Sequence, residues 1–418
     1  MFKKKDTSFF KSITILASGS IIAQFIVIIS APLITRLFTP EEIGFYTYLL
    51  SILILFSPII NGRYDMSIII EKKEANVFSL IKLSLIISFI GSGVITAGLF
   101  LYFKSVSLNH FLHIYIILII FFLLFLSGII NILNAYNNRL KEYKLMSSIY
   151  IIRTTVQNFG AVLLGLFSFG LPGLLVPYLL GQLLGLKRQA SLMIPEFKKI
   201  KKRSNKELLY VAKNHRTQPI YSVPAIFINN FSYTSITFFI GALFGIAQVG
   251  FYSISTRILG MPLSVISGNV SKVFFEAASR EYDETGQFFQ TLKKTTAFLV
   301  ILAIPLVLAM YFVIPPLTTF FFGENWSVAG TYIKALAIMF SLRFIVTSLT
   351  PALHIVVKQK LELIIQALFI VASLSAYLAA ELMNFNILSY LSLLNILFSI
   401  IYVIYYLVIL KLSKSVLT

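Results

Sequence analysis

Residues 111–134 read FLHIYIILIIFFLLFLSGIINILN, an uninterrupted stretch without a single Lys, Arg, Asp or Glu. A helix rises about 1.5 Å per residue, so roughly 20 apolar residues cross the ~30 Å hydrocarbon core of a bilayer. Runs of this kind recur along the whole chain and predict twelve spans. They lie at 12–34, 43–66, 78–103, 111–134, 149–168, 171–193, 219–241, 251–271, 295–317, 329–350, 362–381 and 389–410.

The composition points to lipid as the solvent of this chain. Of its 418 residues, 58% are hydrophobic and 12% are charged, and the mean hydropathy is +0.88. A soluble domain carries about 25% charged residues, so this chain has too little polar surface to cover a globule in water. In lipid each span must satisfy its own backbone hydrogen bonds, and long continuous apolar runs favour helices over the alternating strands of a barrel. We therefore expect an all-α polytopic membrane protein with about twelve transmembrane helices.

The basic residues indicate how the chain is oriented. With the N-terminus in the cytoplasm, 30 of the 35 Lys and Arg residues fall in, or at the edges of, every second connection. This is the positive-inside bias, and it predicts that both termini are cytoplasmic and that the number of spans is even. The remaining five basic residues are Arg36, Lys104, Arg257, Lys334 and Arg343. The net charge of +19 thus reflects membrane topology, and we expect no nucleic-acid partner.

A duplication divides the chain near its middle, at the long basic connection 195–218. Residues 37–46 read LFTPEEIGFY and residues 243–252 read LFGIAQVGFY, so that LF and GFY recur in register. Each half holds six expected spans, an even number, which gives the two halves the same orientation. We expect an N-terminal lobe at 1–210 and a C-terminal lobe at 211–418.

The residues that enzymes and metal sites require are missing from the sequence. The chain has no Cys, and its four His residues form no HExxH pattern. It shows no phosphate-binding GxxxxGK[ST] loop, no nucleophile elbow and no paired catalytic carboxylates. We therefore expect no catalytic residues, no cofactor and no metal site, and the chain is not expected to be an enzyme.

Charged residues inside the spans are the candidates for function, because a charge in lipid is costly and usually faces a cavity or a partner. Arg257 lies deep in the eighth span, and Arg343 lies in the tenth. Arg153 lies one turn into the fifth span, and Arg63 and Asp65 lie near the inner end of the second. For Arg63 and Arg153 the alternative is that the side chain only reaches to the inner surface.

Neighbouring polar residues strengthen the case for a hydrated cavity. Arg257 shares one helical stripe with small residues at positions 253, 260, 264 and 268, and Asn131 and Asn134 line the inner end of the fourth span. Stripes of Ser and Gly alone are explained by helix packing, whereas a stripe with Arg favours a cavity. The deep spans are basic and almost without carboxylates, which suits an anion, and guanidinium groups match phosphate oxygens. We expect Arg63, Asp65, Arg153, Arg257 and Arg343 to bind the substrate.

Three segments carry a resemblance to a known family: RLFTPEEIGFYTYL at 36–49, GRYDMSI at 62–68 and GNVSKVFFEAASREY at 268–282. With them the chain resembles the Wzx-type oligosaccharide flippases, or polysaccharide biosynthesis proteins, of the multidrug/oligosaccharidyl-lipid/polysaccharide exporter superfamily. In that family the second segment commonly reads GRYE, so Asp65 stands here in place of Glu. Only Arg63, Tyr64 and Asp65 are carried over from a family motif. The other arginines are inferred from their depth and face.

The resemblance implies two lobes of six helices around a central cavity. It implies a flippase that moves undecaprenyl-diphosphate-linked oligosaccharide from the cytoplasmic to the outer leaflet by alternating access. The product would be lipopolysaccharide O-antigen or capsule, and the location the bacterial inner membrane. The implied partners are the lipid-linked oligosaccharide, the bilayer, and a polysaccharide polymerase with other proteins of the pathway.

Two other functions stay open. A cation-coupled drug exporter of the same superfamily predicts a buried carboxylate in the first span, and residues 12–34 contain none. A membrane enzyme of the same pathway, such as a sugar polymerase or ligase, predicts a large outer loop. The longest expected outer loop has only about a dozen residues.

Overall fold

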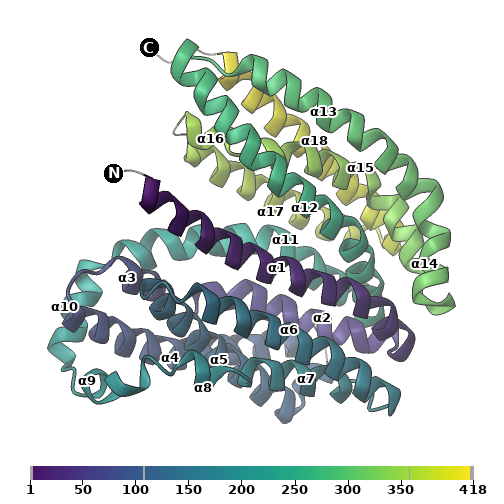
Figure 1. Ribbon diagram of the computed structural model, residues 1–418. Helices are drawn as coiled ribbons and strands as arrows, with labels where there is room; N and C mark the ends of the chain where they lie inside the picture. The colour runs from purple at the N-terminus through teal and green to yellow at the C-terminus, as the bar shows by residue number, and fades with distance from the viewer. Residues whose placement is uncertain (1–2, 107–108, 357, 415–418) are drawn as a thin grey trace. The chain divides into compact units, whose positions relative to one another are not determined.

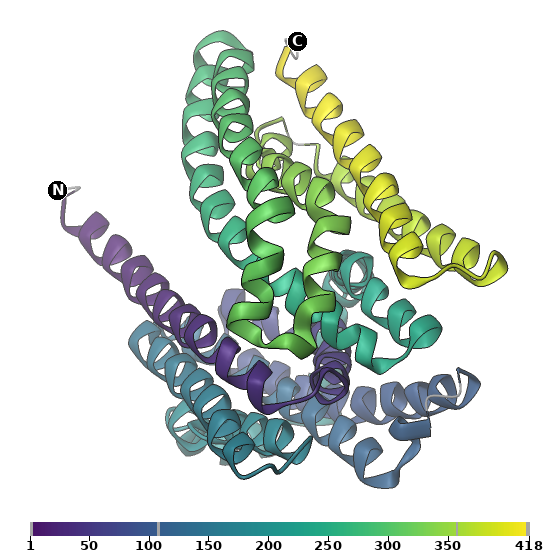
Figure 2. The same ribbon diagram turned by 90° about the vertical axis from the view of Figure 1, so that its right-hand side faces the viewer.

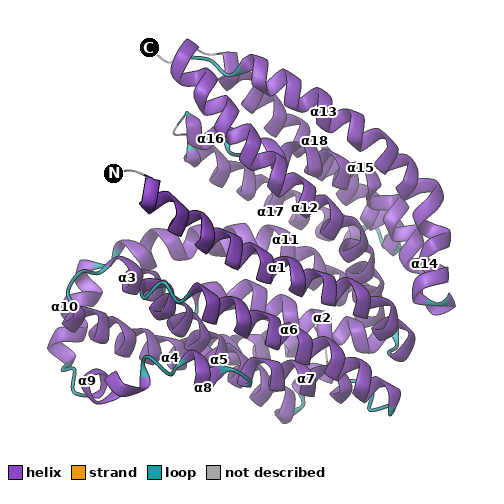
Figure 3. Ribbon diagram, in the orientation of Figure 1, coloured by secondary structure: helices purple, strands orange, loops and turns teal. Residues whose placement is uncertain are grey.

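The computed structural model describes residues 3–106, 109–356 and 358–414, and helices make up nearly all of them (Figure 1). These residues contain no strand, which Figure 3 makes plain. The expected all-α architecture is confirmed. The chain divides into two compact units, Met1–Asn230 and Phe231–Thr418. The expected boundary lay at 210, and the division into two lobes of six spans stays a prediction.

The first unit is built on long helices that pack in pairs. α1 lies along α6 (Figure 2), α6 lies along α7, and α4 lies along α5, with α3 against both α4 and α5. The main helices are α1 (Lys3–Leu37), α2 (Pro40–Phe56), α3 (Tyr64–Ile70), α4 (Glu74–Ser105), α5 (Ile114–Arg139), α6 (Tyr143–Leu166) and α7 (Pro172–Leu183). The short ones are η1 (Ser57–Ile59), η2 (Asn109–Leu112), α8 (Leu186–Gln189), η3 (Ile194–Glu196), α9 (Phe197–Lys201), α10 (Asn205–Asn214) and η4 (Gln218–Ser222).

In the second unit α15 is the central helix, since it packs against α12, α13, α14 and α18. The chain enters this unit in α11 (Val223–Phe244), which begins in the first unit. The further helices are α12 (Ile246–Thr285), α13 (Phe289–Leu308), η5 (Ala309–Val313), α14 (Ile314–Phe322), η6 (Glu324–Trp326), α15 (Ser327–Leu349), α16 (Ala352–Ile355), α17 (Gln359–Leu382) and α18 (Ile387–Lys414).

Ten helices in the described part of the chain are long and apolar enough to cross a membrane. The two other expected spans fall on helices of unusual length. The span at 171–193 corresponds to α7, which has only 12 residues, and the span at 251–271 lies within α12, which has 40. The protein is thus a multi-pass membrane protein.

The two copies of the repeat begin a helix at the same place. α2 starts at Pro40 after Thr39, whose side chain and that of Glu42 form a reciprocal capping box. In the other copy α12 starts at Ile246 after Gly245, which has a φ of 89°. Pro40 and Ile246 are 206 residues apart, which is the offset of the sequence repeat. The shared letters therefore mark the same local junction between two helices in each unit.

The second expected span, 43–66, is not one helix, which corrects the prediction from the sequence. α2 ends at Phe56, a 3-10 turn follows, and the chain reverses at Gly62 and Arg63 before α3 begins. Proline at position 58 cannot donate a helical hydrogen bond, and glycine at 62 accepts the φ of 60° at low cost. In the repeat Ser264 stands where Pro58 stands, and α12 continues unbroken.

The central connection is folded rather than extended. Ser204 and Glu207 form a capping box that starts α10, and α9 and α10 both pack on α4. Ile200 and Val211 enter a buried apolar cluster together with Phe78 of α4. Most basic residues of this connection thus lie on or next to two short helices that pack on α4 within the first unit.

Candidate functional site

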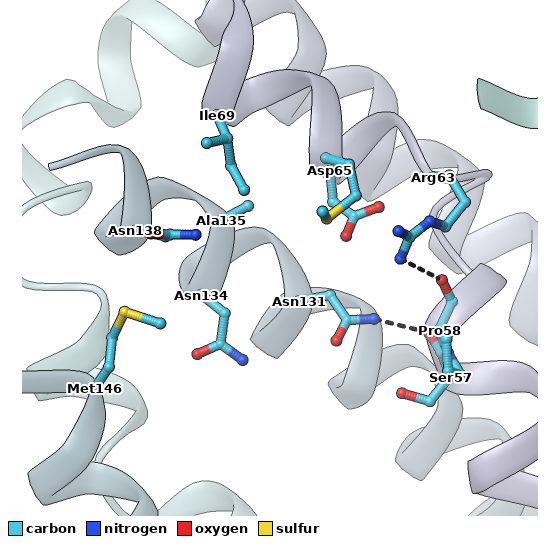
Figure 4. Close-up of a pocket in the computed structure, with 11 residues that line it drawn as sticks. Ser57, Pro58, Arg63, Asp65, Ile69, Asn131, Asn134, Ala135, Asn138 and Met146 are labelled. Atoms are coloured by element: carbon cyan, nitrogen blue, oxygen red, sulfur yellow. Dashed lines mark hydrogen bonds between the residues drawn. The ribbon is translucent and has the colours of Figure 1, made fainter. Parts of the chain in front are cut away.

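A pocket of about 290 Å³, lined by both polar and apolar side chains, lies within the first unit, between α3, α5 and the start of α6. Figure 4 shows its lining side chains. It brings together two residues expected to bind substrate, Arg63 and Asp65, with Asn131 and Asn134 from the fourth expected span. The lining consists of Ser57, Pro58, Arg63, Asp65, Met66, Ile69, Asn131, Asn134, Ala135, Asn138 and Met146.

The turn before α3 sets the position of Arg63. This residue has a φ of 63°, a left-handed conformation that is uncommon for a residue with a side chain. Asn61, which is buried, fixes the turn because its amide nitrogen donates to the carbonyls of Ser84 (3.3 Å) and Gly128 (3.1 Å). One Arg63 nitrogen, Nη1, donates to the Pro58 carbonyl at 3.4 Å, and Nε is buried without a partner. The turn therefore holds a guanidinium group at the pocket wall.

Asp65 is the carboxylate of the pocket and is only 5% exposed. Its Oδ1 atom is buried and has no hydrogen-bond partner among the described residues. A buried acceptor without a donor costs free energy comparable to a lost hydrogen bond. Asp65 thus places a carboxylate in the pocket wall, with its Oδ1 atom enclosed by the protein.

Three asparagines of α5 form the opposite wall. Asn131, Asn134 and Asn138 follow each other at intervals of three and four residues, which places them on one face of the helix. The Asn131 amide nitrogen donates to the Ser57 carbonyl (2.7 Å) and to Asn61 Oδ1 (3.3 Å). The Asn134 carbonyl oxygen accepts from Gln189 Nε2 at 2.6 Å. Asn131 thus uses the nitrogen of its side-chain amide in these bonds, whereas Asn134 uses the oxygen of its own.

Arg153 lies outside the pocket lining and contacts it through an intermediate residue. It is 8% exposed, and its Nη2 donates to Gln189 Oε1 at 2.7 Å. Gln189 in turn donates to Asn134, and the Gln189 carbonyl accepts from Asn137 at 2.8 Å. Arg153 is therefore connected to the pocket through Gln189 and Asn134, and does not line it.

The far end of α3 is anchored by charged groups. Arg139 donates to the carbonyls of Ile68 and Glu71, and His215 lies 3.0 Å from the Glu71 carboxylate. Burial by itself would raise the pKa of the Glu71 carboxyl. The hydrogen bonds from the Lys73 backbone and from His215 lower it by more than burial raises it, so the pKa lies below its ordinary value. These contacts fix the helix that carries Asp65.

The other two expected residues lie in the second unit. Arg343 on α15 places its guanidinium over the rings of Tyr233 (4.7 Å) and Phe340 (5.6 Å), which is a cation–π arrangement. Arg257 is half-buried on α12, and Ser264 and Gly268 of the same stripe are exposed. Among the described residues, no three His, Asp or Glu side chains gather to hold a metal ion.

Sequence reasoning missed Gln189, Asn61 and Asn138. The spacing from Asn131 and Asn134 to Asn138 was the signal that could have found the last one. Gln189 and Asn61 gave no comparable signal, because their partners lie 23 to 70 residues away in the chain.

The model of one protein family matches residues 33–331, well over half of the chain, and describes a polysaccharide biosynthesis protein. The chain belongs to the polysaccharide biosynthesis protein family. No curated protein sequence matches it.

Solved structures show which fold this polysaccharide biosynthesis protein has. An inward-facing multidrug resistance MATE family transporter of the MOP superfamily matches with a TM-score of 0.64 and 15% identity, over 94% of this chain and 96% of the transporter. The lipid II flippase MurJ, in an inward closed conformation, matches with a TM-score of 0.66 and 13% identity, over 95% of this chain and 89% of MurJ. VcmN, a MATE transporter of Vibrio cholerae, matches with a TM-score of 0.52 and 12% identity, over 96% and 95%. The fold is that of MATE transporters and MurJ.

Proposed function

We propose that this protein is a flippase for lipid-linked oligosaccharide. It carries undecaprenyl-diphosphate-linked repeat units from the cytoplasmic to the outer leaflet of the bacterial inner membrane, for O-antigen or capsule synthesis. The observation that carries the proposal is the pocket of the first unit, with the charged side chains of Arg63 and Asp65 in its wall, in a member of the polysaccharide biosynthesis protein family.

A physical argument supports a polar substrate. Charged and amide side chains within a membrane protein are costly unless they face water, each other or a ligand. The pocket gathers a guanidinium, a carboxylate and three amides in one place, and two of their buried polar atoms have no partner. A purely apolar passenger would leave the polar groups of the pocket without partners, whereas the sugar part of a lipid-linked oligosaccharide supplies hydroxyl groups that donate and accept hydrogen bonds.

The charge pattern supports the orientation. With both termini in the cytoplasm, the basic helices α9 and α10 lie on the cytoplasmic side, and the pocket lies toward that side, because Arg139 ends the helix that carries the three asparagines. The two lobes, 1–210 and 211–418, move so that the substrate is open first to the cytoplasmic and then to the outer side of the membrane. A polysaccharide polymerase and other proteins of the pathway use the delivered repeat unit.

The five expected residues receive distinct roles in this proposal. Arg63 and Asp65 contact the headgroup in the pocket, and Arg153 holds the pocket wall through Gln189. Arg257 and Arg343 supply positive charge in the second unit for the diphosphate. The transfer breaks no covalent bond, so the protein needs neither a catalytic residue nor a cofactor.

Deletion of the gene tests the proposal. We expect loss of surface polysaccharide and accumulation of lipid-linked oligosaccharide on the cytoplasmic face, measured by its resistance to a periplasmic glycosidase in spheroplasts. Re-expression of the wild-type chain should restore display. If the oligosaccharide becomes accessible at the wild-type rate in the deletion strain, the protein is not its flippase.

The MATE-like fold keeps a cation-coupled drug exporter as the second candidate, since MATE transporters and MurJ match about equally well. That function predicts greater sensitivity of the deletion strain to cationic drugs, with unchanged polysaccharide. The two measurements, made on the same strain, separate the candidates.

A further inference from the structure

The pocket of the first unit has a charge balance that does not suit a diphosphate. Its charged side chains are one guanidinium, Arg63, and one carboxylate, Asp65, and its other polar side chains are neutral. A diphosphate diester carries two negative charges and offers only acceptors near neutral pH. The Asp65 carboxylate in the pocket wall would repel it. A group that donates a hydrogen bond suits this carboxylate better.

The hydrogen bonds within the wall leave both acceptors and donors toward the pocket. Asn131 uses its amide nitrogen on Ser57 and Asn61, which leaves its carbonyl oxygen as an acceptor. Asn134 uses its carbonyl oxygen on Gln189, which leaves its amide nitrogen as a donor. Asp65 adds a further acceptor and Arg63 a further donor, so the wall carries donors and acceptors side by side. Figure 4 shows these groups around one space.

A hydroxyl group donates one hydrogen bond and accepts two, so adjacent hydroxyls on a ring match a wall on which donors and acceptors are mixed. The size also fits a single ring. At about 290 Å³ the pocket is at the lower limit of sites for drug-sized ligands, which span roughly 300–1,000 Å³.

We propose that this pocket binds one neutral sugar ring of the lipid-linked substrate through its hydroxyl groups, and that the diphosphate binds elsewhere. The inference rests on the proposed function and refines it. Asp65 and Asn134 then determine which sugar the protein accepts, because each needs a hydroxyl or amide at a matching position of the ring. The proposal assigns sugar recognition to the first unit.

Binding of simple glycosides tests this directly. The full-length protein in lipid nanodiscs is mixed with a panel of methyl glycosides, and binding is read by saturation-transfer difference NMR, which detects weak ligands. At least one glycoside should bind the wild type. Asp65→Asn exchanges a charged acceptor for a neutral one, and Asn134→Leu removes the donor, so each should weaken binding about tenfold.

A matched control keeps folding apart from recognition. Asn158 of α6 lies outside the pocket lining and bonds to Ser30 and to the Thr154 carbonyl. Asn158→Leu is the same exchange as Asn134→Leu and should leave glycoside binding unchanged. Thermal unfolding of each variant shows whether it is folded, and a folded Asn134→Leu with wild-type glycoside affinity would overturn the proposal.

Inorganic pyrophosphate is the opposing probe, read by broadening of its phosphorus-31 signal. Its binding should be insensitive to Asn134→Leu. If Asp65→Asn instead strengthens pyrophosphate binding and no glycoside binds the wild type, the pocket is an anion site and the proposal fails. The gene deletion tests the flippase function separately. If deletion alters export but no glycoside binds the protein, the flippase function stands and only the proposal that this pocket binds a sugar fails.

Discussion

Gln189 connects more of the candidate site than any single residue named from the sequence. Its side chain accepts from Arg153 and donates to Asn134, and its carbonyl accepts from Asn137. It is 1% exposed, so none of these bonds is readily replaced by water. Arg63 and Asp65 were found because a motif marked them. Gln189 could not be found in this way, because a single glutamine near the end of an expected span forms no periodic pattern. Its side-chain partners lie 36 and 55 residues away in the chain.

The variant Gln189→Leu should destabilise the protein by about 1–3 kcal/mol, because it leaves the buried Arg153 guanidinium without its acceptor. The double variant Arg153→Met with Gln189→Leu should be more stable than Gln189→Leu alone, because removing both partners leaves no buried charge unpaired. Thermal unfolding of the purified protein in detergent measures both. Additive losses in the double variant would show that the two side chains do not depend on each other.

The proposed contact between Arg257 and the diphosphate can be tested with three substitutions that remove, keep or reverse the charge. Losing a charge-assisted contact costs about 1.5–3 kcal/mol, or roughly ten- to a hundredfold in affinity. Arg257→Ala should cut polysaccharide display sharply, Arg257→Lys should retain part of it, and Arg257→Glu should be worst because it repels phosphate. Arg343 should follow the same order if it shares this role.

Display must be divided by the amount of protein in the membrane, because Arg257 could instead only brace neighbouring helices. Bracing predicts less protein in all three variants with unchanged activity per molecule. Lys334→Ala is the control and should be mild, since Lys334 is near enough to the outer surface to reach water. Full normalised activity of Arg257→Ala would remove Arg257 from the mechanism.

At the scale of helices, the sequence predicted most elements but neither the break in the second span nor the folded central connection. The apolar pattern runs on through Pro58 and Gly62, so periodicity alone gave one span. The reversal depends on Asn61, whose buried amide joins this turn to α4 and α5. Such a contact between segments far apart in the chain cannot be predicted from a local sequence pattern. It is also what places Arg63 and Asp65 in a pocket rather than on a straight helix.

Glu71 allows a test of how α3 is held. The pKa of its carboxyl is lowered in the fold, so the ionised form stabilises the protein above its ordinary pKa of about 4.5, and this contribution is lost as the pH falls through the folded value. Glu71→Gln keeps the shape but removes the charge. It should lower stability at pH 7 by about 1 kcal/mol, because hydrogen bonds from Lys73 and His215 weaken.

The difference between wild type and Glu71→Gln should begin to shrink as the pH falls through about 4.5, where the carboxyl of the unfolded chain gains its proton, and should vanish below the lowered pKa of folded Glu71. Unfolding temperatures measured in detergent from pH 7.5 down to about pH 3 follow this change. Glu276→Gln is the control, because Glu276 pairs with Arg280 on an exposed helix face where an ion pair contributes little. A gap that stays constant with pH would contradict the role given to the Glu71 carboxylate.

At the scale of the whole molecule, the duplication and the pattern of basic residues are better guides to the membrane topology than the lengths of the helices. LF and GFY mark the same helix junction in each unit. The number of crossings, however, depends on two helices that composition does not settle. α7 has 12 residues and is about 18 Å long, short of the ~30 Å core, and α12 has 40 and is about 60 Å long. Whether each crosses once decides the twelve-span topology.

Two fusions of alkaline phosphatase test both helices, since the enzyme is active only where its disulfides form, outside the cytoplasm. With the N-terminus inside, six crossings precede Asn205 and nine precede Asn325, so the fusion after Asn205 should be inactive and that after Asn325 active. If α7 does not cross, both activities reverse. If only α12 fails to cross, both fusions are inactive, and if neither helix crosses, both are active. A green fluorescent protein fused at the same sites should give the opposite pattern, and immunoblots show whether an inactive fusion is present. Because the four outcomes differ, this pair of fusions decides for each helix separately, and any result but the first would refute twelve crossings.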